Sequence, residues 1–121
     1  MNETIYFTFL LPSRERIDCF KKSINSIINN ASKEYKFEIL IACDIDDKDN
    51  THIKKNFMEI ISNEKKYLSF KIIETERYGY SKLQNYYNKL SEISKGDILW
   101  LWNDDCTILT KNWDKLFYQH H

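Results

Sequence analysis

Four short apolar runs alternate along the chain with stretches in which apolar residues recur at helical spacing. The runs cover residues 5–11, 37–43, 68–73 and 98–102. Mainly apolar runs of this length are typical of strands that are covered on both faces of a parallel sheet. Strands that alternate with helices imply a mostly parallel sheet with helices on both faces and right-handed crossovers. The sequence therefore predicts an α/β fold built on a four-stranded sheet.

The stretches between the runs have the pattern of amphipathic helices. The first strand should stop at Pro12, with Ser13 capping a helix over residues 15–31. Three further helices are indicated by apolar stripes at Ile53, Phe57, Ile60 and Ile61, at Leu83, Tyr86, Tyr87, Leu90 and Ile93, and at Trp113, Leu116 and Phe117. The helix before the last strand should close at Gly96 in a left-handed conformation, and Thr110 should cap the final helix. We expect Trp113 to be buried.

Polar and charged residues follow three of the predicted strands. Residues 12–16 come after the first strand, Asp44 and Asp46 after the second, and residues 103–105 after the fourth. The carboxyl ends of parallel strands lie at one edge of a sheet, and ligands bind in the crevice outside that edge. The sequence therefore predicts one pocket that gathers all three loops.

Two adjacent carboxylates, Asp104 and Asp105, indicate a divalent cation because they repel each other without a counter-charge. Mg²⁺ and Mn²⁺ take one or two protein carboxylates and complete their shell with substrate phosphates and water. A nucleotide diphosphate fits that requirement. The alternative is a polar turn that ends the strand, and Asp44 has a similar alternative as an acid near the start of the next helix.

The composition is that of one ordinary soluble domain. With 42% hydrophobic residues, the 121-residue chain can bury one core and is read as a single domain over residues 1–121. Eighteen basic and eighteen acidic side chains cancel, so nucleic acid and anionic membranes are not indicated as partners. The sequence shows no signal-like start and no transmembrane segment, and we expect a cytoplasmic protein. Three widely spaced cysteines argue against a disulfide framework and a zinc site.

Four motifs occur in a recognisable order and are spread along the chain from residue 11 to residue 114. They are Leu-Pro-Ser-Arg-Glu-Arg at 11–16, Ile-Ala-Cys-Asp-Ile-Asp-Asp at 41–47, Gly-Asp-Ile-Leu-x-Leu-x-Asn-Asp-Asp at 96–105 and Thr-Lys-Asn-Trp-Asp at 110–114. This series resembles the nucleotide-sugar-binding half of family 2 glycosyltransferases of the GT-A fold. The resemblance implies a Rossmann-like nucleotide-binding half-domain. It also implies a nucleotide-diphospho-sugar donor, linked to UDP or GDP, and a bound Mn²⁺ or Mg²⁺.

The resemblance also implies roles for individual residues. Asp44 would recognise the base of the nucleotide. Asp105 would coordinate the metal that bridges the diphosphate, and Asp104 would contact the ribose or assist the metal. Asn103 stands where many relatives have the first aspartate of Asp-x-Asp, so it would offer the metal an uncharged oxygen.

Further candidates for the donor pocket are Pro12, Ser13, Arg14, Arg16, Asp46 and Asn88. Relatives often carry Ala-Arg-Asn where this chain has Tyr86-Tyr87-Asn88, so the cationic contact expected from that arginine is missing. Solvated surface charge is the alternative for Arg14 and Arg16.

Members of this family normally continue into a half that binds the acceptor and supplies the catalytic base. Inverting transfer needs a base to deprotonate the acceptor hydroxyl, and no residue of this chain is identified as that base. We therefore expect a nucleotide-sugar-binding domain without its acceptor half. It would be a truncated chain, one half of a split enzyme, or a domain that a homodimer or a partner chain completes. Two other functions stay open: a non-catalytic binding or assembly module, and a metal-dependent phosphoryl-transfer or hydrolase domain that uses Asp44, Asp104 and Asp105.

Overall fold

The computed structural model describes residues 5, 7–48, 51, 53–55, 58–59 and 67–119. Its elements are β1 (Phe7–Ser13), α1 (Ile17–Asn30), β2 (Phe37–Asp44), β3 (Leu68–Thr75), the 3₁₀ helix η1 (Tyr80–Lys82), α3 (Leu83–Ile93), β4 (Ile98–Leu101) and α4 (Trp113–Gln119). The strands form one sheet in the order β3-β2-β1-β4, and all three pairings are parallel. The predicted α/β fold is therefore confirmed. Of the stripe predicted at Ile53, Phe57, Ile60 and Ile61, Ile53 is buried and the other three lie outside the described residues.

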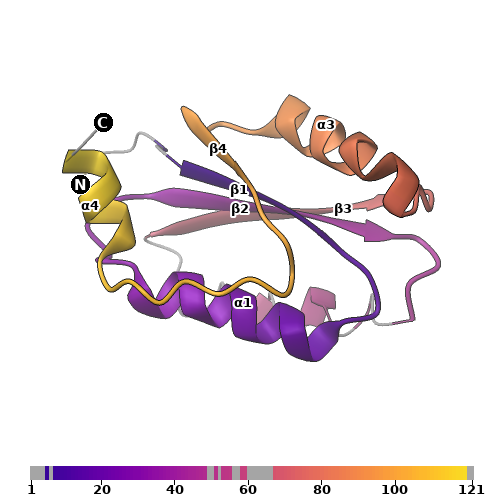
Figure 1. The fold of residues 1–121 in the computed structure, drawn as a ribbon, viewed down its shortest axis with the longest axis horizontal. Helices are drawn as coiled ribbons and strands as arrows, with labels where there is room; N and C mark the ends of the chain where they lie inside the picture. The colour runs from indigo at the N-terminus through magenta and orange to yellow at the C-terminus, as the bar shows by residue number, and fades with distance from the viewer. Residues whose placement is uncertain are drawn as a thin grey trace.

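Helices cover both faces of the sheet, with α1 on one face and α3 on the other (Figure 1). Alternate side chains of β1 supply the two halves of the core. Phe9 and Leu11 pack with Ile24 of α1, whereas Leu10 packs with Leu90 of α3. The apolar runs therefore fold as fully buried strands because each side of β1 and β2 has its own helix layer.

The segment 102–112 lies along α1 and fixes the loop that follows β4 (Figure 1). Trp102 Nε1 donates to Ser23 Oγ at 2.8 Å, and the N–H of Ile108 donates to Ser26 Oγ at 2.9 Å. The segment leads to α4, where Trp113 is buried as predicted. These contacts hold the acidic loop at the carboxyl end of the sheet.

The first strand does not stop at Pro12 as predicted but continues through Ser13. Leu10 O accepts a hydrogen bond from the N–H of Trp102 at 2.9 Å, so this residue of β1 faces β4. Two positions further along, the nitrogen of Pro12 faces the same side, where β4 has already ended at Leu101. The missing N–H of proline therefore costs no sheet hydrogen bond.

Helix α1 starts at Ile17 rather than at the predicted residue 15, and Ser13 does not cap it. Arg16 is the cap residue and makes no side-chain cap hydrogen bond. Similarly, α4 starts at Trp113, directly after Asn112, whose φ is 58°. Thr110 therefore does not adjoin the helix, and the prediction that it caps α4 is wrong.

Gly96 does not close α3 in a left-handed conformation, because α3 ends at Ile93 and Gly96 has no positive φ. A β-carbon at position 96 would lie 2.8 Å from Thr8 N and 2.9 Å from Phe7 C, and it would also collide with Thr8 Oγ1. The N–H of Gly96 donates to Thr8 Oγ1 at 2.9 Å. Glycine is needed here for close approach to β1.

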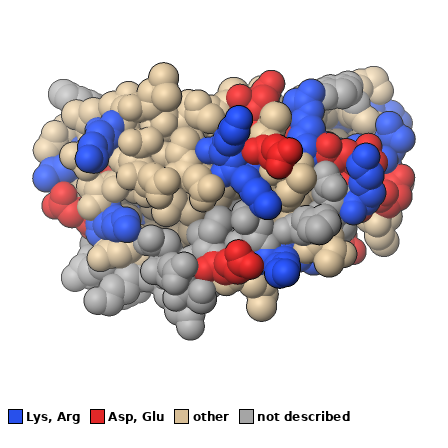
Figure 2. Space-filling view, turned by 90° about the horizontal axis from the view of Figure 1, so that it is seen from below, with Lys and Arg blue, Asp and Glu red and all other residues tan. Residues whose placement is uncertain are grey.

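β4 was predicted to be a central strand covered on both faces, but it is an edge strand of the described sheet. Leu101 is 65% exposed, and Leu109 in the following segment is 89% exposed. Both line an apolar groove with Leu116 and Phe117 of α4. Figure 2 shows a broad area without charged side chains on the face that carries α1 and the segment after β4.

In the described part of the chain, no helix is long and apolar enough to cross a bilayer.

Candidate functional site

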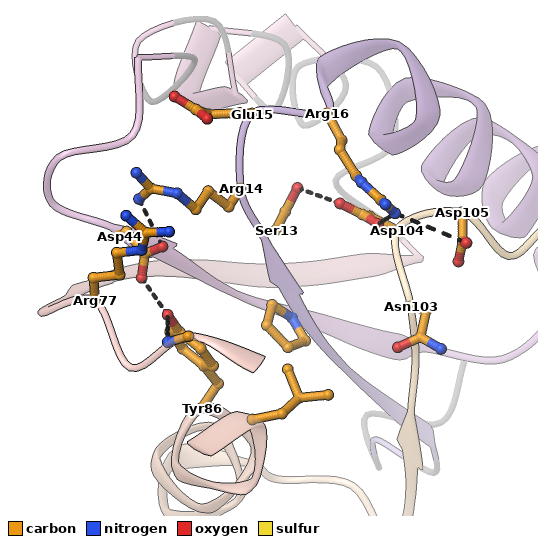
Figure 3. Close-up of a pocket in the computed structure, with 13 residues that line it drawn as sticks. Ser13, Arg14, Glu15, Arg16, Asp44, Arg77, Tyr86, Asn103, Asp104 and Asp105 are labelled. Atoms are coloured by element: carbon orange, nitrogen blue, oxygen red, sulfur yellow. Dashed lines mark hydrogen bonds and ion pairs between the residues drawn. The ribbon is translucent and has the colours of Figure 1, made fainter. Parts of the chain in front are cut away.

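A cavity of about 630 Å³ opens at the carboxyl ends of β1, β2 and β4 (Figure 3). β2 and β4 lie on either side of β1, so the connectivity of the sheet reverses direction at this point. Such switch points are where open α/β sheets bind ligands, and the volume is typical of small-molecule sites. The lining residues are Pro12, Ser13, Arg14, Glu15, Arg16, Asp44, Arg77, Gly79, Leu83, Tyr86, Asn103, Asp104 and Asp105.

Most of the residues predicted for the site meet in this cavity. Those in the lining are Pro12, Ser13, Arg14, Arg16, Asp44, Asn103, Asp104 and Asp105. Asp46 is outside the lining but binds Arg14, which is part of it. Asn88 is exposed on α3 and is not a lining residue.

Asp44 is the centre of one end of the cavity. It is 2% exposed, and both of its carboxylate oxygens accept hydrogen bonds. Arg14 Nη1 donates to Oδ2 at 2.9 Å, and the hydroxyl of Tyr86 donates to Oδ1 at 2.5 Å. Arg14 also donates to Asp46 Oδ1 at 2.6 Å. These hydrogen bonds to Asp46 and Asp44 raise the pKa of Arg14, and the same contact from Arg14 lowers the pKa of Asp46. This end combines a buried acceptor with guanidinium donors.

The turn after β1 places its two arginines at opposite ends of the cavity. Glu15 has a φ of 52°, an uncommon conformation for a residue with a β-carbon. Its N–H donates to the two carboxylate oxygens of Asp47 at 3.2 and 3.1 Å. Figure 3 shows Arg14 directed toward Asp44 and Arg16 directed toward Asp104. Asp47 therefore acts as the structural anchor of this turn.

Asp104 and Asp105 form the other end of the cavity and differ in how they are held. Asp104 is 7% exposed, with Oδ2 accepting from Ser13 Oγ at 3.1 Å and Oδ1 from Arg16 Nη1 at 3.3 Å. Burial raises the pKa of Asp104, although the contacts with Ser13 and Arg16 act in the opposite direction. The side chain of Asp105 is 59% exposed and lies 3.8 Å from Arg16 Nη1. Asp105 therefore offers the more accessible oxygens.

Five lining residues were not predicted as site residues: Glu15, Arg77, Gly79, Leu83 and Tyr86. Tyr86 had been assigned to the apolar stripe of its helix, and its hydroxyl gave no signal in that pattern. Arg77 follows β3 at the same sheet edge as the other strand-end loops, and this position could have identified it. Asn103 is exposed, and its Oδ1 lies 3.2 Å from the hydroxyl of Tyr87.

The residues at the Asp104 end fit a cation that takes some of its ligands from the protein and the others from a diphosphate. In the part of the chain that the structure describes, no group of three or more His, Cys, Asp or Glu side chains could hold a metal ion by itself. Mg²⁺ bound with substrate phosphates needs only one or two protein carboxylates. Asp105 meets this need, with Asp104 and Asn103 adjacent to it in the sequence.

Comparisons with known proteins support the fold. No protein-family model matches the sequence, and no curated protein matches it. Among solved structures, it is similar to residues 1–349 of TarS from S. aureus in complex with UDP, with a TM-score of 0.73 and 15% sequence identity. The similarity covers 94% of this chain and 31% of the TarS chain. At this identity the likeness shows a shared Rossmann-like α/β fold.

Proposed function

We propose that this chain is the nucleotide-sugar-binding half of a GT-A glycosyltransferase related to family 2, acting by inverting transfer. The observation that carries the proposal is the cavity at the switch point of the sheet, with Asp44 at one end and Asp104 and Asp105 at the other. A nucleotide diphosphate has a hydrogen-bonding base at one end and a metal-binding group at the other. The UDP complex of TarS, which has the same fold, supports a ligand of this class.

Uracil suits the Asp44 end better than guanine does. Its exposed edge presents an acceptor, a donor and an acceptor in a row. Asp44 supplies an acceptor, and Arg14 and Arg77 supply donors. A carboxylate has about four lone-pair positions, so Asp44 can accept a further bond beside those from Arg14 and Tyr86. Guanine presents two adjacent donors that pair with both oxygens of one carboxylate, and each oxygen of Asp44 already accepts a hydrogen bond, whereas uracil needs only one further bond from Asp44. We therefore propose a UDP-linked donor.

The other end would receive the diphosphate together with Mn²⁺ or Mg²⁺. Asp105 is proposed as the direct ligand because its side chain is the more exposed of the two. Asp104, held by Ser13, would contact the ribose or assist the cation. When bound, the cation supplies positive charge that stabilises the departing diphosphate. Neutral Asn103 would contribute an oxygen without charge.

Transfer also needs a base that removes the proton of the acceptor hydroxyl. We assign none of the described residues to that role. The proposed function therefore includes an acceptor half, provided by further sequence or by a partner chain, that completes the site next to Asp105.

Calorimetric titration with UDP and GDP, with and without Mn²⁺, tests this function. We expect UDP to bind in a Mn²⁺-dependent manner and more tightly than GDP. Asp105→Asn should remove the Mn²⁺ dependence, and Asp44→Asn should remove the preference for UDP. Asp97→Asn is a matched control because Asp97 is exposed just before β4, at the opposite end of that strand. Absence of UDP binding to the folded wild-type protein would reject the proposal.

A second candidate function is an assembly module, and the exposed groove beside β4 favours it. The edge position of β4 leaves Leu101, Leu109 and Leu116 exposed, and exposed apolar patches often mark interaction surfaces. A stable dimer by sedimentation equilibrium, combined with no UDP affinity, would support this candidate. The hydrolase hypothesis receives no such support, because Asp44 lies at the opposite end of the cavity from Asp104 and Asp105, so the three carboxylates do not gather around one cation.

A further inference from the structure

Arg16 is in contact with both carboxylates at the proposed metal end of the site. Its Nη1 lies 3.3 Å from Asp104 Oδ1 and 3.8 Å from Asp105 Oδ2. Arg16 comes from the residue before α1, whereas the carboxylates come from the loop after β4. The guanidinium therefore neutralises an acidic pair contributed by another part of the chain.

The two contacts of Arg16 differ in strength. Asp104 is buried, and its Oδ2 accepts a second hydrogen bond from Ser13, so this carboxylate is fixed. Asp105 is exposed, and 3.8 Å is too long for a hydrogen bond from Arg16. An exposed ion pair at this distance contributes little to stability. Arg16 can therefore leave Asp105 at small cost.

We propose that Arg16 is an exchangeable counter-ion, which holds Asp104 and Asp105 before the donor binds and contacts the diphosphate afterwards. This inference rests on the proposed function. A divalent cation and a guanidinium repel each other, so a cation bound to Asp105 weakens the contact between Arg16 and this carboxylate. The diphosphate brings new negative charge beside the cation, and guanidinium groups bind phosphate oxygens in a bidentate manner. Donor binding thus gives Arg16 a new partner as it loses the old one.

The exchange predicts effects of opposite sign in one variant, Arg16→Gln. Mn²⁺ alone should bind about fivefold more tightly than to the wild type, because a competing positive charge at about 4 Å has been removed. UDP in saturating Mn²⁺ should bind about fivefold more weakly, because a phosphate contact has been lost. A purely structural role of Arg16 would weaken both.

Electron paramagnetic resonance of free Mn²⁺ measures the first effect without any nucleotide, and calorimetry measures the second. Arg16→Lys should keep Mn²⁺ affinity near that of the wild type because the positive charge remains. Lys89→Gln, a change at an exposed position on α3 outside the cavity lining, removes one charge elsewhere and should change neither affinity. Adding Asp105→Asn to Arg16→Gln should abolish the gain in Mn²⁺ affinity. Circular dichroism confirms that each variant is folded.

Equal Mn²⁺ affinity of the wild type and Arg16→Gln would overturn the counter-ion role. Tighter UDP binding by Arg16→Gln would overturn the contact with the diphosphate. Tighter Mn²⁺ binding by Arg16→Gln, with no UDP binding by any of the proteins, would reject the proposed function but support the counter-ion role.

Discussion

The hydroxyl of Tyr86 donates a 2.5 Å hydrogen bond to Asp44 Oδ1 across a sequence separation of 42 residues. The same hydroxyl oxygen accepts the N–H of Tyr78 at 2.9 Å. Tyr86 therefore joins α3 and the loop after β3 to the end of β2. This connection orients the carboxylate that we propose as the base-recognising group.

Tyr86→Phe should lower both stability and UDP affinity. Loss of a buried hydrogen bond to a charged partner should reduce the free energy of unfolding by about 1.5–3 kcal/mol, measured by urea denaturation. UDP should bind several-fold more weakly because Asp44 loses one of the groups that orient it. Tyr35→Phe is the matched control, since Tyr35 stacks on Tyr118 and does not line the cavity. Unchanged UDP affinity in a destabilised Tyr86→Phe would show that Tyr86 does not position Asp44.

The two glycines of the chain should respond differently to alanine. Gly96→Ala would push a methyl group into the backbone of Phe7 and Thr8 and should destabilise the protein by about 3 kcal/mol. Gly79 has a φ of 76° but nothing within 4 Å of a β-carbon, so Gly79→Ala should cost only about 1 kcal/mol of backbone strain. Urea denaturation of the two variants gives the comparison. A larger loss for Gly79→Ala would contradict the close approach of Gly96 to β1.

Asp114→Ala should destabilise the connection between α4 and the end of α1. Asp114 is fully buried and accepts hydrogen bonds at 2.8 Å from both the N–H and the hydroxyl of Ser32. Its removal leaves buried donors without their acceptor and should lower the free energy of unfolding by about 2–3 kcal/mol. Glu34→Gln, which removes an exposed ion pair with Lys115, should have a much smaller effect. Equal losses in urea denaturation would contradict this difference.

The three cysteines should differ in reactivity. Cys43 is buried, and burial raises the pKa of its thiol from the ordinary 9.0 to about 12. Cys19 and Cys106 are exposed. At pH 8 a thiol reagent should therefore modify Cys19 and Cys106 rapidly and Cys43 only after denaturation. Mass spectrometry of the modified peptides measures this, and rapid modification of Cys43 in the folded protein would contradict its burial.

The same thiol has a consequence for stability at alkaline pH. The raised pKa leaves the folded state unaffected below pH 9, where the thiol is protonated in the folded and unfolded chains alike. Above pH 9 the unfolded thiol ionises and the folded one does not, so stability falls as pH rises toward 12. Cys43→Ala should show a shallower fall between these pH values in thermal unfolding. An identical slope in both proteins would exclude Cys43 as its cause.

The fold was largely predictable because its signals are local. Apolar runs and helical stripes each reflect a few consecutive residues, and parallel order then brings the strand-end loops together. What failed depends on distant parts of the chain. Pro12 fits inside β1 because β4 ends before it, and Gly96 is set by Thr8 across the sheet.

The site was predictable in its loops and less so in its side chains. Charged residues after β1, β2 and β4 met in one cavity because strand ends share an edge. Tyr86 could not be assigned, since a tyrosine in an apolar stripe has the same pattern whether its hydroxyl reaches solvent or a carboxylate. The edge position of β4 depends on strand order, which an apolar run does not specify.

The most direct test of the nucleotide site is a titration of the ¹⁵N-labelled protein with UDP and Mg²⁺, followed by amide chemical shifts. We predict that the shifts concentrate in residues 13–16, 77–79 and 103–105, which border the cavity, and leave Leu109 and Leu116 of the apolar groove unchanged. Shifts confined to the groove, or no shifts at saturating UDP, would contradict the assignment of this cavity as a nucleotide-sugar site.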